Sequence, residues 1–175
     1  MFYKYGSSKT WNFLGSCAYR QHGADSHCNQ EHGYAMSFYA EFGSDTLDVR
    51  NWVVDFGSLR PFKEKLEEWF DHTMLVASDD PQREALLHLG RLGIAKVVEV
   101  EATGCEALAT WMYDYLNGIP EMNYTDGFLR QLGYGQVWCT KFMVTETPGN
   151  SGWRALTLDE YMTYHVDDTK RRGWR

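Results

Sequence analysis

The stretch from His32 to Phe42, His-Gly-Tyr-Ala-Met-Ser-Phe-Tyr-Ala-Glu-Phe, decides the fold class of this chain. Every second residue from Tyr34 to Phe42 is apolar or aromatic. This period is that of a β-strand with one buried face, and it places His32 and Tyr34 on the same side of the strand.

Further strands are expected on both sides of this segment. The run from Thr10 to Tyr19 predicts one of them. The turn-forming residues of 43–51 lead into an expected third strand, Trp52 to Phe56. The first third of the chain is therefore expected to form an antiparallel meander.

A helix is expected next, with Ser58 as its cap and with Asp71 and His72 at its C-terminal end. Its apolar residues recur at intervals of three or four, which marks one buried helical face. These residues are Leu59, Phe62, Leu66 and Phe70.

Four more elements follow from periodicity and turn signals. They are a short helix opened by Pro81 and ending near Gly90 or Gly93, a strand from Lys96 to Val100, an amphipathic helix from Cys105 to Leu116, and a β-prone run from Gly135 to Thr147. The region 78–95 is interpreted as an insertion beside the core. Helices and antiparallel strands in this order predict an α+β fold.

The C-terminal residues are polar, and they divide the chain into a domain of residues 1–150 and an extension of residues 151–175. Thr157 and Glu160 can cap a short helix there. The basic end Lys170-Arg171-Arg172 is expected to be loosely held.

Composition excludes several classes of function. The chain has 175 residues, enough for one domain with a hydrophobic core, and a net charge of −7, which disfavours nucleic acid as the main partner. No apolar run approaches the ~20 residues that span a bilayer, and no signal-peptide core is visible at the N-terminus. The four cysteines are widely spaced, so we expect reduced thiols in a soluble, cytoplasmic protein.

Two groups of residues are candidates for chemistry. Cys28 lies in a polar loop, and the imidazoles of His27 and His32 are close enough in sequence to activate a thiol as a nucleophile or base. The carboxylate of Asp71 can orient the neighbouring imidazole of His72. Taken alone, Cys28 can equally be an incidental thiol, and Asp71-His72 a surface or capping feature.

Taken together, the order of these landmarks resembles the 6-pyruvoyltetrahydropterin synthase and 6-carboxytetrahydropterin synthase family. Six landmarks carry the resemblance: Phe13-x-x-x-Cys17, Cys28-x-x-x-His32-Gly33-Tyr34, Val54-Asp55-Phe56-x-x-Leu59-Arg60, Phe70-Asp71-His72-x-x-Leu75, Glu106-x-Leu108-Ala109-x-Trp111 and Val144-Thr145-Glu146-Thr147. They cover residues 13–147. The blocks around Asp55-Phe56, Asp71-His72 and Glu146-Thr147 match the family pattern best.

The resemblance implies the tunnelling fold (T-fold). This fold is a four-stranded antiparallel sheet with helices on one face, which assembles into a barrel and, as a dimer of trimers, into a hexamer with sites between subunits. It also implies that Cys28 acts as the base, supported by Asp71 and His72, while the Glu146 carboxylate binds the pterin edge. Glu106, Thr103 and Tyr34 are further candidates for binding the substrate. The Thr103-to-Glu106 spacing is one residue longer than in the family motif.

The expected metal site departs from the family. The three zinc histidines of the family correspond here to Cys17, His32 and Tyr34. Thiolate is a good zinc ligand and tyrosine is a poor one, so we expect a zinc ion held by Cys17, His27 and His32. A different ligand set, with His22 in reserve, and a site without metal both remain open.

The function implied is that of a 6-carboxy-5,6,7,8-tetrahydropterin synthase-like lyase. It would convert 7,8-dihydroneopterin triphosphate on the route to queuosine and other 7-deazaguanines. One alternative is a 6-pyruvoyltetrahydropterin synthase, which only eliminates triphosphate. Another is a pterin- or purine-binding protein of the same fold without catalysis. A third branch of the family, with glutamate in place of the cysteine, is disfavoured by Cys28 although Glu31 is nearby.

Overall fold

The computed structural model describes residues 2–118 and 127–166. In chain order its strands are β1 (Tyr5–Tyr19), β2 (His32–Ser44), β3 (Thr73–Ala77), β4 (Lys96–Val100), β5 (Trp138–Thr147) and β6 (Asn150–Ala155). Its helices are the single turn η1 (His27–Asn29), α1 (Arg60–Phe70), α2 (Arg83–Arg91), α3 (Cys105–Asn117), α4 (Phe128–Gln131), α5 (Leu158–Tyr161) and the π-helical turn η3 (Met162–Val166). None of the helices in these two ranges is long and apolar enough to cross a membrane.

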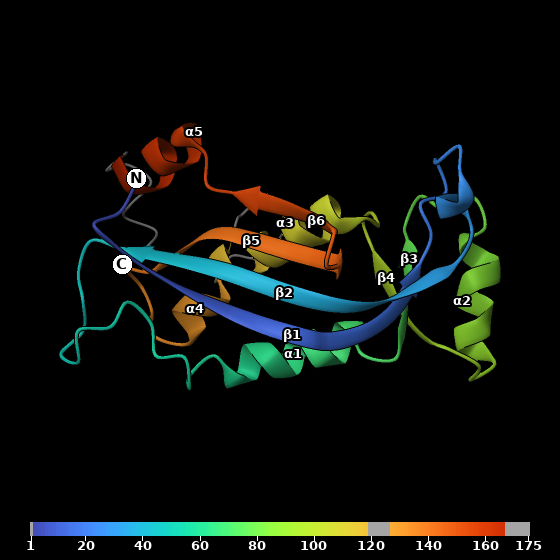
Figure 1. Ribbon diagram of the computed structural model, residues 1–175, viewed down its shortest axis with the longest axis horizontal. Helices are drawn as coiled ribbons and strands as arrows, with labels where there is room; N and C mark the ends of the chain where they lie inside the picture. The colour runs from blue at the N-terminus through green and yellow to red at the C-terminus, as the bar shows by residue number, and fades with distance from the viewer. Residues whose placement is uncertain (1, 119–126, 167–175) are drawn as a thin grey trace.

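The six strands form one curled sheet in the order β4-β3-β1-β2-β5-β6 (Figure 1). Strands β1, β2, β5 and β6 are antiparallel neighbours, as the sequence predicts for a T-fold. Strand β3 adds to β1 in parallel through the pairs Cys17↔Thr73 and Ala18↔Met74, and β4 adds to β3 in parallel. The expected sheet of four strands is thus wrong in number, because β3 and β4, on either side of the insertion at residues 78–95, extend it to six.

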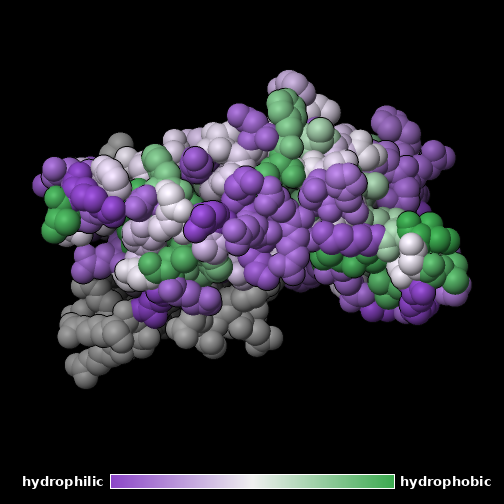
Figure 2. All heavy atoms as spheres, turned by 90° about the horizontal axis from the view of Figure 1, so that it is seen from below, coloured by the Kyte–Doolittle hydropathy of each residue, from purple (hydrophilic) through white to green (hydrophobic). Residues whose placement is uncertain are grey.

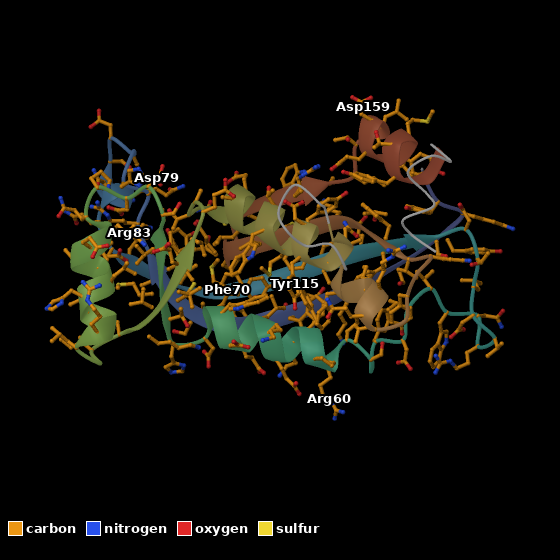
Figure 3. All side chains as sticks on the ribbon, turned by 180° about the vertical axis from the view of Figure 1, so that it is seen from behind. Arg60, Phe70, Asp79, Arg83, Tyr115 and Asp159 are labelled. Carbon is orange, nitrogen blue, oxygen red and sulfur yellow. The ribbon has the colours of Figure 1, made fainter. Side chains whose placement is uncertain are left out.

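Helices α1, α3 and α4 cover one face of the sheet (Figures 1 and 3). The alternating residues of β2 meet them, with the ring centroids of Phe38 and Phe70 only 4.8 Å apart. Phe62 of α1 is also fully buried and packs edge-on against Phe142 of β5, 6.0 Å away. The apolar residues that alternate along β2 thus pack against those that recur every three or four residues on α1. The predicted strand face and helix face are confirmed as the two sides of one core.

The outward surface of the α1 layer is hydrophilic, and hydrophobic residues gather at the end of the molecule that carries α2 (Figure 2). On α1, Lys63 pairs with Glu67 at 2.6 Å and Lys65 pairs with Glu68 at 2.6 Å. Charged pairs spaced three or four residues apart are typical of the solvent-exposed face of a helix. Helix α2 has no buried residue, so it lies beside the core as expected for an insertion.

Two expectations for residues 45–60 are wrong. Residues 52–56 form bends and turns instead of a third strand, because the Asp48 carboxylate accepts the backbone N–H groups of Arg50 (2.8 Å) and Trp52 (2.9 Å). Side-chain acceptors of this kind compete with strand pairing. Ser58 does not cap α1 either, since its hydroxyl donates to the Asp55 carbonyl at 2.7 Å.

The segment interpreted as a polar extension contributes the edge strand β6, which the sequence analysis missed. Strand β6 pairs with β5 across a tight turn at Pro148-Gly149, a dipeptide that itself signals a turn. The capping box of Thr157 and Glu160 is confirmed at α5. The Tyr161 ring then packs on Phe2, 5.2 Å between centroids, so this part of the segment is held in place. Lys170-Arg171-Arg172 lies outside the described residues.

Strand β6 approaches α3 so closely that only glycine fits at position 152. A Cβ atom there would lie 2.6 Å from the Glu106 backbone nitrogen and 2.7 Å from the Cys105 Cβ. Replacing Gly152 by alanine should therefore lower the free energy of unfolding by about 1–3 kcal/mol, as overpacking does, measured by urea denaturation. Gly149→Ala is the matched control, because its Cβ would meet no atom within 4 Å. Equal stability of the two variants would contradict this packing.

Candidate active site

The Glu146 carboxylate lies at the end of β5, on the face of the sheet that the helices cover. The hydroxyl of Tyr19, from the end of β1, donates to Glu146 Oε1. Tyr19 is fully buried, and burial, followed by this hydrogen bond, raises the pKa of its hydroxyl well above the usual value. The Cys105 thiol, at the start of α3, lies on the same side: burial, followed by the nearby Glu146 carboxylate, raises its pKa to about 12. Glu146 is thus held by the neutral Tyr19 hydroxyl next to a neutral thiol.

The Tyr34 ring packs with the rings of Tyr19 and His32 in one aromatic cluster. The centroid of Tyr34 is 5.0 Å from that of His32 and 5.7 Å from that of Tyr19, and the Tyr19 and His32 centroids are 5.8 Å apart. Burial raises the pKa of the Tyr34 hydroxyl, and the charges of Glu146 and Cys28 raise it further. Tyr34 thus belongs to a cluster that reaches Glu146 through the Tyr19 hydroxyl, and its role in binding substrate stays a prediction.

Cys28 lies in the single helical turn η1, between β1 and β2. The Ser26 hydroxyl caps this turn by accepting the Cys28 backbone N–H at 3.3 Å, and the Cys28 carbonyl accepts from the Gln21 N–H at 2.8 Å. Cys28 is partly exposed, whereas Cys17, Cys105 and Cys139 are buried. Cys28 is therefore the thiol that a substrate can reach.

Asp71 and His72 lie at the C-terminal end of α1, as predicted. His72 Nδ1 is 3.0 Å from Asp71 Oδ1, and this hydrogen bond lowers the pKa of the Asp71 carboxyl group. The His72 side chain is 85% exposed, and its backbone has a φ of 54°. Asp71 otherwise contacts the backbone of Ser16 and the amine of Lys96. Among the described residues of one subunit, no hydrogen bond or ion pair links Asp71 or His72 to Cys28.

Thr103 and Glu106 flank the start of α3. The Thr103 hydroxyl donates to the Arg20 carbonyl at 2.7 Å, so it is engaged with the backbone that leads into the Cys28 loop. Glu106 lies in the first turn of α3 and is exposed. Thr103 thus anchors the loop, and the role of Glu106 in binding substrate stays a prediction.

The expected zinc ligands are not assembled. Within residues 2–118 and 127–166, no three His, Cys, Asp or Glu side chains are grouped so that they could hold a metal ion. Cys17 points toward the helices and is 3% exposed, and burial raises the pKa of its thiol to about 12, with Cys105 and Glu146 adding to the shift. His27 is exposed in η1. A buried neutral thiol and a solvent-facing imidazole do not fit a zinc site with His32.

Tyr19 and Cys105 are the site residues that the sequence analysis missed. Tyr19 follows Cys17 at strand period, so it points to the same side and sits opposite His32. The alternation of side-chain direction along the strand could therefore have indicated that Tyr19 belongs to the site. Nothing in the sequence brings Cys105 to Glu146, because β5 follows α3 by many residues and only the packed sheet joins them.

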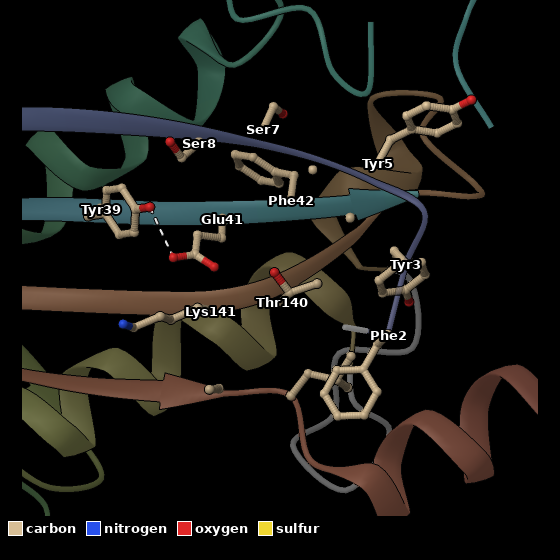
Figure 4. A pocket seen from close by; sticks show the side chains of 14 residues that line it. Phe2, Tyr3, Tyr5, Ser7, Ser8, Tyr39, Glu41, Phe42, Thr140 and Lys141 are labelled. Carbon is tan, nitrogen blue, oxygen red and sulfur yellow. Dashed lines mark hydrogen bonds between the residues drawn. The ribbon is translucent and has the colours of Figure 1, made fainter. Parts of the chain in front are cut away.

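A separate hollow of about 470 Å³ lies at the other end of the strands (Figure 4). There the Tyr39 hydroxyl donates to Glu41 at 3.0 Å, on the sheet face opposite to the helices. Phe2, Tyr3 and Leu156 contribute apolar walls. Because it is lined by none of the candidate site residues, this hollow belongs to a different part of the surface.

Comparisons with known proteins identify the family of this chain. The family model described as 6-pyruvoyl tetrahydropterin synthase matches residues 9–152. A curated relative, 6-carboxy-5,6,7,8-tetrahydropterin synthase of Aquifex aeolicus, is 32% identical over 91 residues. That match covers 51% of this chain and 56% of the relative, so the chain spans little more than half of the relative's length.

Solved structures share the fold. An uncharacterized protein of Wolinella succinogenes matches with a TM-score of 0.72 and 19% identity, covering 87% of this chain and 98% of that one. The 6-pyruvoyl tetrahydropterin synthase of Caenorhabditis elegans matches with a TM-score of 0.55 and 14% identity, covering 87% and 96%. The fold is therefore the α+β T-fold, and the chain belongs to the 6-pyruvoyl tetrahydropterin synthase family.

Proposed function

We propose that this protein is a tetrahydropterin synthase-type lyase that acts on 7,8-dihydroneopterin triphosphate. The observation that carries the proposal is the Glu146 carboxylate, which accepts from the Tyr19 hydroxyl beside the ring cluster of Tyr19, Tyr34 and His32, together with the accessible thiol of Cys28 in the loop that precedes His32. A carboxylate offers two acceptor oxygens to the planar amino and ring N–H edge of a pterin. Such binding places the side chain of the substrate toward the Cys28 loop.

The thiolate of Cys28 acts as the base in this proposal. It removes a proton from a side-chain carbon, and the electron pair of that C–H bond forms a double bond as the neighbouring C–O bond to triphosphate breaks. The 6-carboxy branch continues by cleaving the side chain and releasing acetaldehyde. The relative of Aquifex aeolicus supports this branch by its name, 6-carboxy-5,6,7,8-tetrahydropterin synthase. We further propose that the product lies on a route to 7-deazaguanines and queuosine.

Asp71 and His72 have a place in this proposal only if a second copy is present. The His72 side chain is 85% exposed within the subunit, so it is available to a site that a neighbouring subunit completes. We therefore propose a homo-oligomer, a dimer of trimers as in the family. The free state of all four cysteines supports a location in the cytoplasm. No donor set within residues 2–118 and 127–166 matches zinc, so the proposed steps are written for the side chains alone.

Product analysis tests the proposal. Purified protein is incubated with 7,8-dihydroneopterin triphosphate, and pterins, triphosphate and acetaldehyde are quantified by chromatography and mass spectrometry. Release of acetaldehyde with 6-carboxytetrahydropterin is the expected result. Triphosphate release with a 6-pyruvoyl product would favour the other branch.

A binding protein without catalysis is the second candidate, favoured by the lack of an assembled metal-ligand set among the described residues. Tight pterin binding with no turnover would support it. Absence of both binding and turnover would refute the proposed function.

A further inference from the structure

Arg20, the first residue after β1, connects two segments that the sequence keeps far apart. Its Nε and Nη2 donate to the two carboxylate oxygens of Asp80 at 2.8 and 2.7 Å. Its Nη1 donates to both the carbonyl and the side-chain oxygen of Asn29, each at 3.1 Å. One guanidinium thus joins the turn between β3 and α2 to the residue that follows Cys28.

Asp80 is a rigid anchor for this guanidinium. Its side chain is only 1% exposed, and one of its oxygens also accepts the Gln82 backbone N–H at 2.7 Å. Its carbonyl accepts from the Arg83 N–H at 2.9 Å, at the start of α2. A two-pronged Arg–carboxylate pair fixes orientation as well as distance, which a lysine could not do.

The Cys28 loop is held at three points around Arg20. The Thr103 hydroxyl fixes the Arg20 carbonyl, the Gln21 N–H fixes the Cys28 carbonyl, and the guanidinium fixes Asn29. The loop itself contributes no buried residue through η1. Polar contacts, rather than apolar packing, therefore decide where Cys28 lies.

The insertion itself packs little. Helix α2, which lies between β3 and β4, buries no residue. Asp79 and Arg83 both lie on the α2 side of the molecule, next to the loop between β1 and β2 (Figure 3), where His22 is 3.8 Å from Asp79. The contact of the insertion with this loop is thus polar and centred on the pair of the partly buried Arg20 with the buried Asp80.

We infer that Asp80, acting through Arg20, is a positioning residue for the Cys28 loop, and that the insertion serves to hold this loop. The inference rests on the proposed role of Cys28 as the base. It gives a function to the insertion at residues 78–95, which adds no residue to the Glu146 end of the site. Loss of the pair should let Asn29 and Cys28 shift while Glu146, at the end of β5, keeps its place.

Asp80→Asn in the full-length protein is the test. An amide cannot accept both prongs of the guanidinium, so kcat should fall about 10- to 100-fold, as misplacement of a reacting group does, while KM changes little. Glu99→Gln is the matched control, because it breaks the 2.5 Å pair that Glu99 of β4 makes with Arg83 of the insertion, without touching Arg20 or Asn29. The control should keep the kcat of the parent protein.

Alkylation of Cys28 by iodoacetamide, followed by intact-mass spectrometry without substrate, provides an independent readout. The other three cysteines are buried, so the modification reports on the loop, and a Cys28→Ala variant gives the background. The alkylation rate should rise several-fold in Asp80→Asn and stay unchanged in Glu99→Gln. An unchanged rate in Asp80→Asn would overturn the inference, whatever happens to activity.

The two readouts separate this inference from the proposed function. A faster alkylation with undiminished kcat would show that Asp80 positions the loop but that Cys28 is not the base. Removal of a buried partner can also unfold a protein. If Asp80→Asn does not fold, Asn29→Ala, which removes one side-chain acceptor of Arg20, should show the same two changes in smaller measure, and unchanged alkylation there would equally overturn the inference.

Discussion

Replacing Cys28 by alanine is expected to abolish turnover while leaving pterin binding nearly intact. The thiol is the proposed base, and loss of a positioned base lowers a rate by about 10²–10⁴-fold. Pterin affinity should persist because Glu146 and Tyr34, not the loop, contact the ring in this proposal. Turnover is measured by product formation, and affinity by titration of pterin fluorescence.

Asp25→Ala is the control for this experiment, since Asp25 is an exposed residue of the same loop. It should leave both rate and affinity unchanged. Full activity in Cys28→Ala would remove Cys28 from the mechanism. A loss of affinity as large as the loss of rate would show instead that the loop binds the substrate.

Replacing Glu146 by glutamine should produce the complementary result, a loss of affinity. The amide keeps one acceptor, which Tyr19 can still occupy, and presents a donor where the pterin edge also has donors. Binding should weaken by about 1–3 kcal/mol, the usual cost of a buried polar group left unpaired, which is about 5- to 150-fold in Kd. The measurement is again a fluorescence titration.

Glu41→Gln is the matched control for Glu146→Gln. Both carboxylates accept from a tyrosine hydroxyl, but Glu41 bonds Tyr39 on the opposite face of the sheet. Its replacement should leave pterin affinity unchanged. If Glu41→Gln weakened binding and Glu146→Gln did not, the pterin pocket would lie at the other end of the strands.

Sequence periodicity was sufficient to locate the strands and helices that bury one face. The strands β1, β2, β4 and β5 and the helices α1, α2 and α3 lie where alternation, helical spacing and turn residues predict them. These patterns are local, because a half-buried strand or helix must repeat its apolar residues at the period of its own backbone. The motifs around Cys28, Asp71 and Glu146 sufficed for the family in the same way.

Only the tertiary structure decided the features that depend on partners distant in sequence. The segment from Trp52 to Phe56 has the composition of a strand, but the Asp48 side chain accepts the Trp52 N–H and the Tyr134 hydroxyl accepts the Asp55 N–H, in place of a neighbouring strand. Strand β6 is a half-exposed edge with no clear alternation, so it became visible only through its pairing with β5.

The site shows the same division. The sequence by itself determined which side chains carry chemistry and that His32 and Tyr34 share a face, since strand period fixes direction. It could not determine that Tyr19 and Cys105 converge on Glu146, that Cys17 and His27 end in opposite environments, or that Arg20 reaches Asp80. These facts depend on which strands become neighbours and which loops pack together, and that is decided by burial and hydrogen bonding across the whole folded chain.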